Sequence, residues 1–167
     1  AEAEGWDAVT TRRLSTEIEY SQPVLYKHFT GMEQIAEAVA LDGFDELAGV
    51  LRDARSGAGA ASDALARIAH AYLDFARRNP AVYDAMFTRA TTLRFAAQDT
   101  PSQLVAAFAE LRHTVGAVAD EHDADALTEV FWAALHGLVT LGRAGRLRPG
   151  YDSERLQLLI NQFTSSR

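Results

Sequence analysis

Apolar residues recur at helical spacing along most of the chain, and this periodicity limits the possible folds more than any other feature. Side chains three and four positions apart lie on one face of an α-helix, so such a run predicts a helix with one buried face. The clearest run comprises Leu65, Ile68, Ala69, Tyr72, Leu73 and Ala76. No stretch alternates apolar and polar residues as a half-buried strand would. The sequence therefore predicts an all-α protein.

Glycine, proline and capping residues divide the chain into separate helices. The Gly/Ala-rich segment 56–61 is the best linker, Ser62 or Asp63 is expected to cap the helix that follows it, and Asn79-Pro80 ends that helix. Beyond this helix, the pattern predicts helices over 32–51, 81–87, 102–121, 125–143 and 152–163.

Composition excludes several classes of protein. The chain has no cysteine, which rules out disulfides, a thiolate nucleophile and iron-sulfur ligation. No apolar run approaches the roughly 20 residues that span a bilayer, and residues 1–9 do not resemble a signal peptide, so we expect a cytoplasmic protein with no membrane contact. A net charge of −7 argues against a general polyanion binder, and residues 1–45 hold nine acidic and only three basic side chains.

No pattern in the sequence predicts catalysis, a cofactor or a metal. There is no phosphate-cradling glycine loop and no nucleophile elbow, so the chain is not expected to be an enzyme. The spacing of His113, His122, Asp123 and Asp125 matches no common set of metal ligands. We interpret these acidic residues as part of a solvated helix junction.

Residues 10–29 predict two short helices separated by a break at residues 19–21. Ser21 can cap the second helix and Pro23 fits its first turn. Two short helices joined by a tight turn form a helix-turn-helix, whose second helix presents side chains to the DNA major groove. Val24 and Pro23 could contact a thymine methyl group, and Gln22 is best placed for a base edge. Further candidate DNA contacts are Thr10, Thr11 and Arg13 on the first helix and Ser21 and Lys27 on the second.

At these residues the chain resembles the tetracycline-repressor (TetR) family of bacterial regulators. The resemblance runs from G-W-D-A-V-T-T-R-R-L at Gly5 to S-Q-P-V-L-Y-K-H-F at Ser21. It implies that Tyr26 and His28 contact phosphate and that Phe29 packs the small domain; a half-buried core tyrosine and a surface histidine are the alternatives.

The second half resembles a C-terminal type of this family that is named for its Trp, His and Gly. These residues are Trp132, His136 and Gly137, preceded by N-P-A-V-Y-D-A-M-F at 79–87. The resemblance implies a mostly apolar cavity for a small effector, and the candidate ligand-binding residues are Tyr72, Phe75, Tyr83, Met86, Phe87, Phe108, Trp132 and His136. The alternative for each of them is a plain core position.

The N-terminal segment, residues 1–45, departs from the family pattern at three places. Only four residues precede Gly5, where the family has a full helix, so either the sequence is incomplete or the head is reduced. Glu19 stands where the turn normally has a glycine, at a position that often needs a positive φ. Gly31-Met32-Glu33 replaces the usual Ser-Lys-Glu and removes a lysine expected to contact phosphate.

These observations predict a DNA-binding head at 1–45 and an antiparallel helical ligand-binding and dimerisation domain at 46–167. We expect a ligand-responsive transcriptional regulator that binds a palindromic operator as a homodimer. Repression is the expected mode of regulation. Helices 125–143 and 152–164 would form the dimer interface, and a small apolar effector would release the DNA. The alternative is a helical small-molecule or protein-binding module of the same fold that has lost DNA binding.

Overall fold

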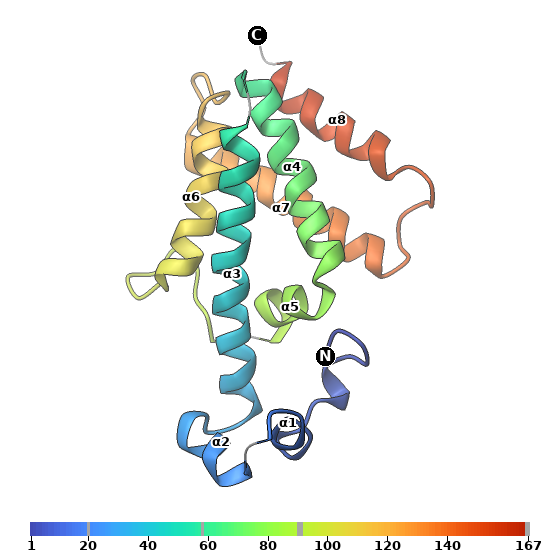
Figure 1. The fold of residues 1–167 in the computed structure, drawn as a ribbon. Helices are drawn as coiled ribbons and strands as arrows, with labels where there is room; N and C mark the ends of the chain where they lie inside the picture. The colour runs from blue at the N-terminus through green and yellow to red at the C-terminus, as the bar shows by residue number, and fades with distance from the viewer. Residues whose placement is uncertain (20, 58, 90–91, 166–167) are drawn as a thin grey trace. The chain divides into compact units, whose positions relative to one another are not determined.

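The computed structural model describes residues 1–19, 21–57, 59–89 and 92–165 as an array of helices with no strand among them (Figure 1). Tyr20 and Ala58, which fall in the predicted turn and linker, lie outside the described residues. The elements are η1 (Trp6–Ala8), α1 (Thr11–Glu17), α2 (Gln22–His28), α3 (Met32–Ser56), α4 (Ala61–Arg78), α5 (Pro80–Asp84), the π-helical turn η2 (Ala85–Arg89), α6 (Ser102–Gly116), α7 (Ala124–Arg143) and α8 (Asp152–Thr164). The predicted all-α class is confirmed.

The described helices group into two compact units. The first unit contains Ala1–Asp45 and Asn79–Leu104, and the second contains Glu46–Arg78 and Val105–Arg167. The expected boundary after residue 45 falls inside α3. Segment 79–104, which the sequence analysis places in the larger domain, groups with residues 1–45. Side chains of residues 2–7 bind this segment, and Phe44 packs on it. The functional roles of the two parts stay predictions.

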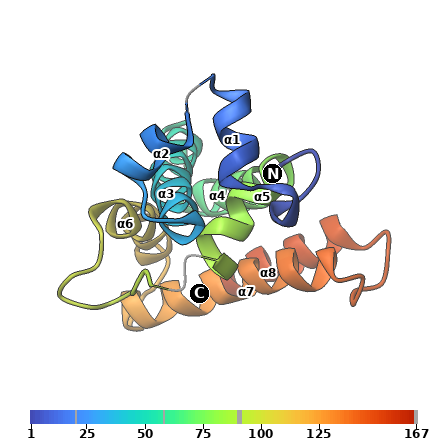
Figure 2. The same cartoon turned by 90° about the horizontal axis from the view of Figure 1, so that it is seen from below.

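In the first unit, α1 and α2 are short helices that contact each other and are joined by the turn at residue 19 (Figure 2). Thr10 caps α1 by accepting a hydrogen bond from the backbone N–H of Arg13 at 3.2 Å. Pro23 occupies the first turn of α2, where its missing N–H costs nothing. Two helices of seven residues are marginal alone, so their stability depends on packing.

The core of the first unit lies between the first half of α3 and the α5–η2 segment. Phe44 of α3 makes edge-on ring contacts with Phe87 at 5.4 Å and with Phe95 at 5.7 Å. The two segments approach closely at Gly43, where a Cβ atom would lie 2.6 Å from Val82 Cγ1. This close packing depends on a residue without a side chain.

The second unit is a bundle in which α4 packs against both α7 and α8 (Figure 1). Its largest fully buried apolar side chains come from four helices, namely Leu51, Leu65, Ile68, Tyr72, Val115, Phe131 and Leu135. Glu110 of α6 accepts hydrogen bonds from Arg52 and Arg55 of α3, each at 3.0 Å. Helix α6 ends at Gly116, five residues before the predicted end, and a turn with a positive φ at Asp120 follows.

Candidate DNA-binding interface

The second helix of the predicted helix-turn-helix buries one side and exposes the other. Leu25 is buried, and the half-buried Phe29 follows the helix as its C-cap, so both face the core. Tyr26, Lys27 and His28 are exposed, with 52% of Tyr26 accessible to solvent. This exposed side is where the sequence predicts phosphate and base contacts.

The hydroxyl of Tyr26 is anchored to the first helix. Its oxygen lies 3.2 Å from Thr11 Oγ1, and this hydrogen bond joins α2 to the first turn of α1. Thr10, one residue earlier, accepts the N–H of Arg13 and retains its own hydroxyl proton for donation. The predicted phosphate contacts Thr10, Thr11 and Tyr26 therefore come together at one end of α1.

The remaining candidates on α2 lie near its start. Ser21 is the exposed N-cap of α2 and its side chain makes no capping hydrogen bond. Gln22 and Val24 are half-buried in the first turn. Such a helix start offers a hydroxyl, an amide and an apolar methyl group, and the base contacts expected of these residues stay a prediction.

Arg13, a candidate DNA contact, is paired with a carboxylate of the same chain. Its two terminal nitrogens donate to the two carboxylate oxygens of Glu4 at 2.5 and 2.7 Å. Hydrogen bonding to Arg13, followed by the attraction of its charge, lowers the pKa of Glu4, and the same contact raises the pKa of Arg13. Arg12, which sequence reasoning did not select, is exposed on the same helix. Among the described residues it forms no ion pair.

The turn between α1 and α2 uses a left-handed residue. Glu19 has a φ of 57°, a conformation that glycine adopts easily and other residues avoid. The expectation that this position requires a positive φ is confirmed. Glu17 and Glu19 are both exposed here, so carboxylates lie beside the predicted DNA contacts.

The candidate ligand-binding residues divide between the two units. Tyr72, Phe75, Phe108, Trp132 and His136 belong to the second unit, while Tyr83, Met86 and Phe87 belong to the first. Tyr83 and Phe87 are in ring contact at 4.6 Å. The cavities found at 60–62 with 118–120, at 1–17 and at 73–77 with 138–155 are lined by other residues. A shared ligand site for the eight residues stays a prediction.

In the second unit, a hydrogen bond of Trp132 joins α7 to α4, and His136 lies one turn further along α7. Trp132 Nε1 donates to the hydroxyl oxygen of the buried Tyr72 at 3.1 Å. His136 is half-buried, and burial, followed by the positive charge of Arg143, lowers its pKa. The indole and the phenol thus hold each other in place beside a histidine that favours its neutral form.

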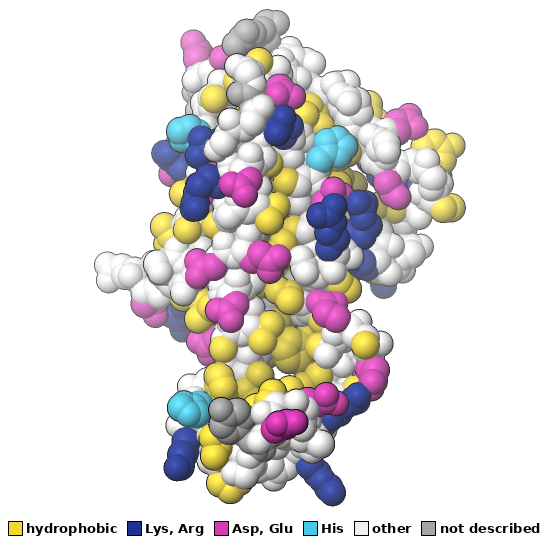
Figure 3. Space-filling model, viewed as in Figure 1, with side chains coloured by type: hydrophobic (Ala, Val, Ile, Leu, Met, Phe, Trp, Pro, Cys, Tyr) yellow, Lys and Arg dark blue, Asp and Glu magenta, His cyan; other side chains and the backbone are white. Residues whose placement is uncertain are grey.

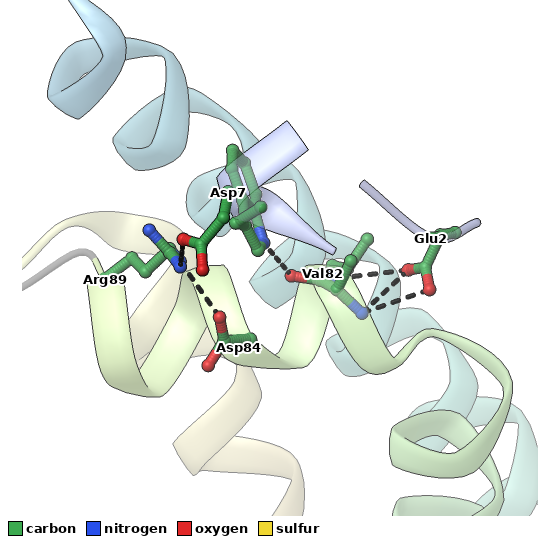
Figure 4. Close-up of polar contacts among 7 residues, drawn as sticks. Glu2, Asp7, Val82, Asp84 and Arg89 are labelled. Atoms are coloured by element: carbon green, nitrogen blue, oxygen red, sulfur yellow. Dashed lines mark hydrogen bonds and ion pairs between the residues drawn. The ribbon is translucent and has the colours of Figure 1, made fainter. Parts of the chain in front are cut away.

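Segment 79–89 is attached to the N-terminal residues by a set of polar contacts that the sequence analysis missed (Figure 4). The carboxylate of Glu2 accepts the backbone N–H groups of Ala81 and Val82 at 3.0 and 3.1 Å, which caps α5. Trp6 Nε1 donates to the carbonyl oxygen of Ala81 at 2.8 Å. The residues of each contact are at least 75 positions apart, so no local pattern signals them.

Arg89 at the end of η2 completes this attachment. Its guanidinium donates to Asp84 at 3.0 Å and to Asp7 at 3.1 Å, and it lies 5.7 Å from the ring centroid of Trp6. The hydrogen bond to Asp84 is the first cause of the raised pKa of Arg89. We call Glu2, Trp6, Asp7 and Arg89 the N-terminal clasp.

Comparison with known families connects this geometry to a known group of proteins. Residues 65–162 match the "Tetracyclin repressor-like, C-terminal domain", and residues 1–39 match the "Bacterial regulatory proteins, tetR family". The chain belongs to the TetR family. Its head match covers α1, α2 and the start of α3, and its C-terminal match covers α4 to α8.

Two curated proteins and a solved structure are similar to this chain. The chain is 32% identical over 147 residues to the uncharacterized HTH-type transcriptional regulator Rv0681 of Mycobacterium tuberculosis, covering 85% of the chain and 64% of that protein. It is 30% identical to the uncharacterized HTH-type transcriptional regulator YobS of Bacillus subtilis, covering 84% and 72%. A protein of unknown function from Rhodococcus sp. RHA1 shares the fold with a TM-score of 0.76 and 27% identity, covering 98% of this chain and 87% of that one.

Among the described residues, no helix combines the length and the apolar character that a membrane span needs.

Proposed function

We propose that this TetR-family chain is a transcriptional regulator that binds operator DNA through α1 and α2. The observation that carries the proposal is the Thr11–Tyr26 hydrogen bond, which places hydroxyls from both helices at one end of α1 beside the exposed side of α2. Hydroxyl donors positioned this way suit a phosphate, while Gln22 and Val24 suit base edges. The two relatives named as HTH-type transcriptional regulators support it.

The regulator is proposed to act as a homodimer on a palindromic operator. Val130 and Leu141 of α7 and Leu158 of α8 are 60%, 42% and 55% exposed, which supports burial of these two helices against a second copy. Two copies of α2 separated by about 34 Å would read successive major grooves. A small, mostly apolar effector in the larger domain would favour a state that releases DNA, and repression is the proposed outcome. The proposed location is the cytoplasm.

The test is a titration of the full chain against genomic fragments, including the region upstream of its own gene, at two salt concentrations. We expect one fragment to bind selectively and its affinity to fall with salt. Lys27→Glu should abolish this binding because it places a carboxylate near phosphate. Arg146→Glu, an exposed charge reversal in the second unit, should leave it unchanged.

A second candidate function is a ligand-binding module that has lost DNA binding. The Glu4–Arg13 ion pair favours it, because the Glu4 carboxylate binds the guanidinium group that would otherwise be available to a DNA phosphate. No selective binding of the wild type to any fragment at low salt would contradict the regulator and support this module.

A further inference from the structure

A cavity of about 370 Å³ lies in the second unit between α4, α7 and the start of α8. Its size falls in the range of about 300 to 1,000 Å³ that small-molecule sites occupy. The apolar part of its wall comes from α4, α7 and the loop before α8, namely Leu73, Ala76, Leu138, Val139 and Leu147. Because none of the eight candidate ligand-binding residues lines it, this cavity is a separate site.

Three arginines surround this apolar wall. Arg77 lies near the end of α4, Arg143 at the end of α7 and Arg155 in the first turns of α8, whereas Asp152 is the single carboxylate in the lining. Figure 3 shows Lys or Arg side chains gathered over the C-terminal part of α4. The lining therefore carries an excess of positive charge.

The arginines are held in place by local contacts. Arg155 pairs with Asp152 at 2.7 Å and also donates to the carbonyl oxygen of Arg148. Arg143 donates to the carbonyl oxygen of Ala76 in the last turn of α4. Arg77 pairs with Asp74 at 2.5 Å on the exposed side of α4, where water screens the pair. A ligand carboxylate can replace this screened partner.

The positive charge of Arg143 also affects a neighbouring ionisable group. It contributes to the lowered pKa of His136, two helical turns earlier on α7, after the larger effect of burial. This agrees with a positive field on the α7 side of the cavity.

We propose that this cavity binds a small amphipathic carboxylic acid. The hydrocarbon part lies against Leu73, Leu138 and Leu147, which removes apolar surface from water on both sides. The carboxylate lies at the arginines, whose planar guanidinium groups match its two oxygens. A neutral head group would lose the charge-assisted hydrogen bonds, and a cationic one would be repelled.

The test uses three probes with the same hydrocarbon chain, decanoate, decanol and decylamine, titrated into the full chain by calorimetry without DNA. We expect decanoate to bind about tenfold more tightly than decanol, because hydrogen bonds to charged groups are the stronger ones. Decylamine should not bind. Since no DNA is present, the outcome is independent of the proposed regulator function.

Matched variants locate the site. Arg77→Gln should weaken decanoate binding by about five- to tenfold and leave decanol binding unchanged. Arg78→Gln is the control, since Arg78 is the next, exposed arginine and does not line the cavity. Leu147→Gln, in the loop before α8, should weaken both probes because it removes apolar wall. Thermal unfolding of each variant checks that its fold is intact.

Three outcomes would overturn the proposal. Decanol or decylamine binding as tightly as decanoate would remove the role of the arginines. Equal effects of Arg77→Gln and Arg78→Gln would place the acid elsewhere. A decanoate affinity that falls as the protein concentration rises would show that a second copy of the chain occupies the cavity.

Discussion

Glu19 adopts a backbone conformation that its own side chain disfavours. A non-glycine residue in the left-handed region costs about 1 kcal/mol or more, and Glu19 has a φ of 57°. This strain is maintained by the packing of α1 and α2 on either side of the turn.

Replacing Glu19 with glycine should therefore stabilise the protein. We expect the free energy of unfolding, measured by urea denaturation, to rise by about 0.5 to 1 kcal/mol. Glu17→Gly is the matched control, because Glu17 is the exposed last residue of α1 and has helical backbone. It should lower stability by up to about 1 kcal/mol. Equal effects of the two substitutions would mean that the turn stores no strain.

Glu4 limits what Arg13 can contribute to DNA binding. Because the two side chains form a doubly hydrogen-bonded pair, phosphate must compete with a carboxylate for the guanidinium. Glu4→Gln should raise DNA affinity severalfold and steepen the slope of log affinity against log salt by about one for each protomer. Filter binding over a range of salt concentrations measures both. An unchanged slope, or the same change in the exposed control Glu46→Gln, would contradict this role.

His136 makes stability depend on pH in a direction set by its lowered pKa. Below its ordinary value of 6.5, the unfolded chain binds a proton that the folded chain resists, so unfolding becomes easier as pH falls. The contribution of neutral His136 to the free energy of unfolding is complete above pH 6.5. It is lost as pH falls through the lower pKa that His136 has in the folded chain. Melting temperatures between pH 5 and pH 8 should fall less steeply toward acid in His136→Gln than in the wild type. The exposed His70→Gln should follow the wild type.

At the scale of elements, the contact between α3 and α5–η2 depends on Gly43. A Cβ atom there would lie 2.6 Å from Val82 Cγ1 and 2.8 Å from Met86 Sδ. Gly43→Ala should therefore destabilise the protein by about 1 to 3 kcal/mol through overpacking. Gly49→Ala, in the same helix with nothing within 4 Å of its Cβ position, should stabilise it by up to about 1 kcal/mol. Chemical denaturation of both variants measures the change in the free energy of unfolding. Changes of the same sign in the two variants would contradict the prediction.

Helices with a regular apolar spacing or clear end signals in their own sequence could be predicted. The apolar spacing of α4, α7 and α8 and the capping and proline signals of α2 gave their positions to within a few residues. The exposed side of α2 followed from the same reasoning. The assignment of segment 79–104 to the first unit could not be predicted, because the hydrogen bond from Trp6 to Ala81 joins residues 75 positions apart. The pairing of Arg13 with Glu4 was missed because Glu4 is nine residues away and precedes the first helical element.

At the scale of the whole molecule, the exposed apolar residues of α7 and α8 determine the proposed assembly. Leu158→Glu would place a charge on the exposed side of α8, and a buried interface does not tolerate an unpaired charge. We expect light scattering to change from about twice 18.2 kDa to a single chain mass. Val105→Glu on α6, with 53% of Val105 exposed, is the control and should remain dimeric. A wild type that is monomeric at high concentration would contradict the dimer.

The N-terminal clasp also constrains the order in which the protein can fold during synthesis. Its two sides belong to one compact unit, yet a long stretch of chain separates them. A nascent chain that has released only residues 1–45 has no partner for Trp6 and no helix end for Glu2 to cap. The head therefore closes only after residues 79–89 have left the ribosome, and its high contact order should make that closure slow. A fragment cut at residue 45 would behave as an unfinished domain.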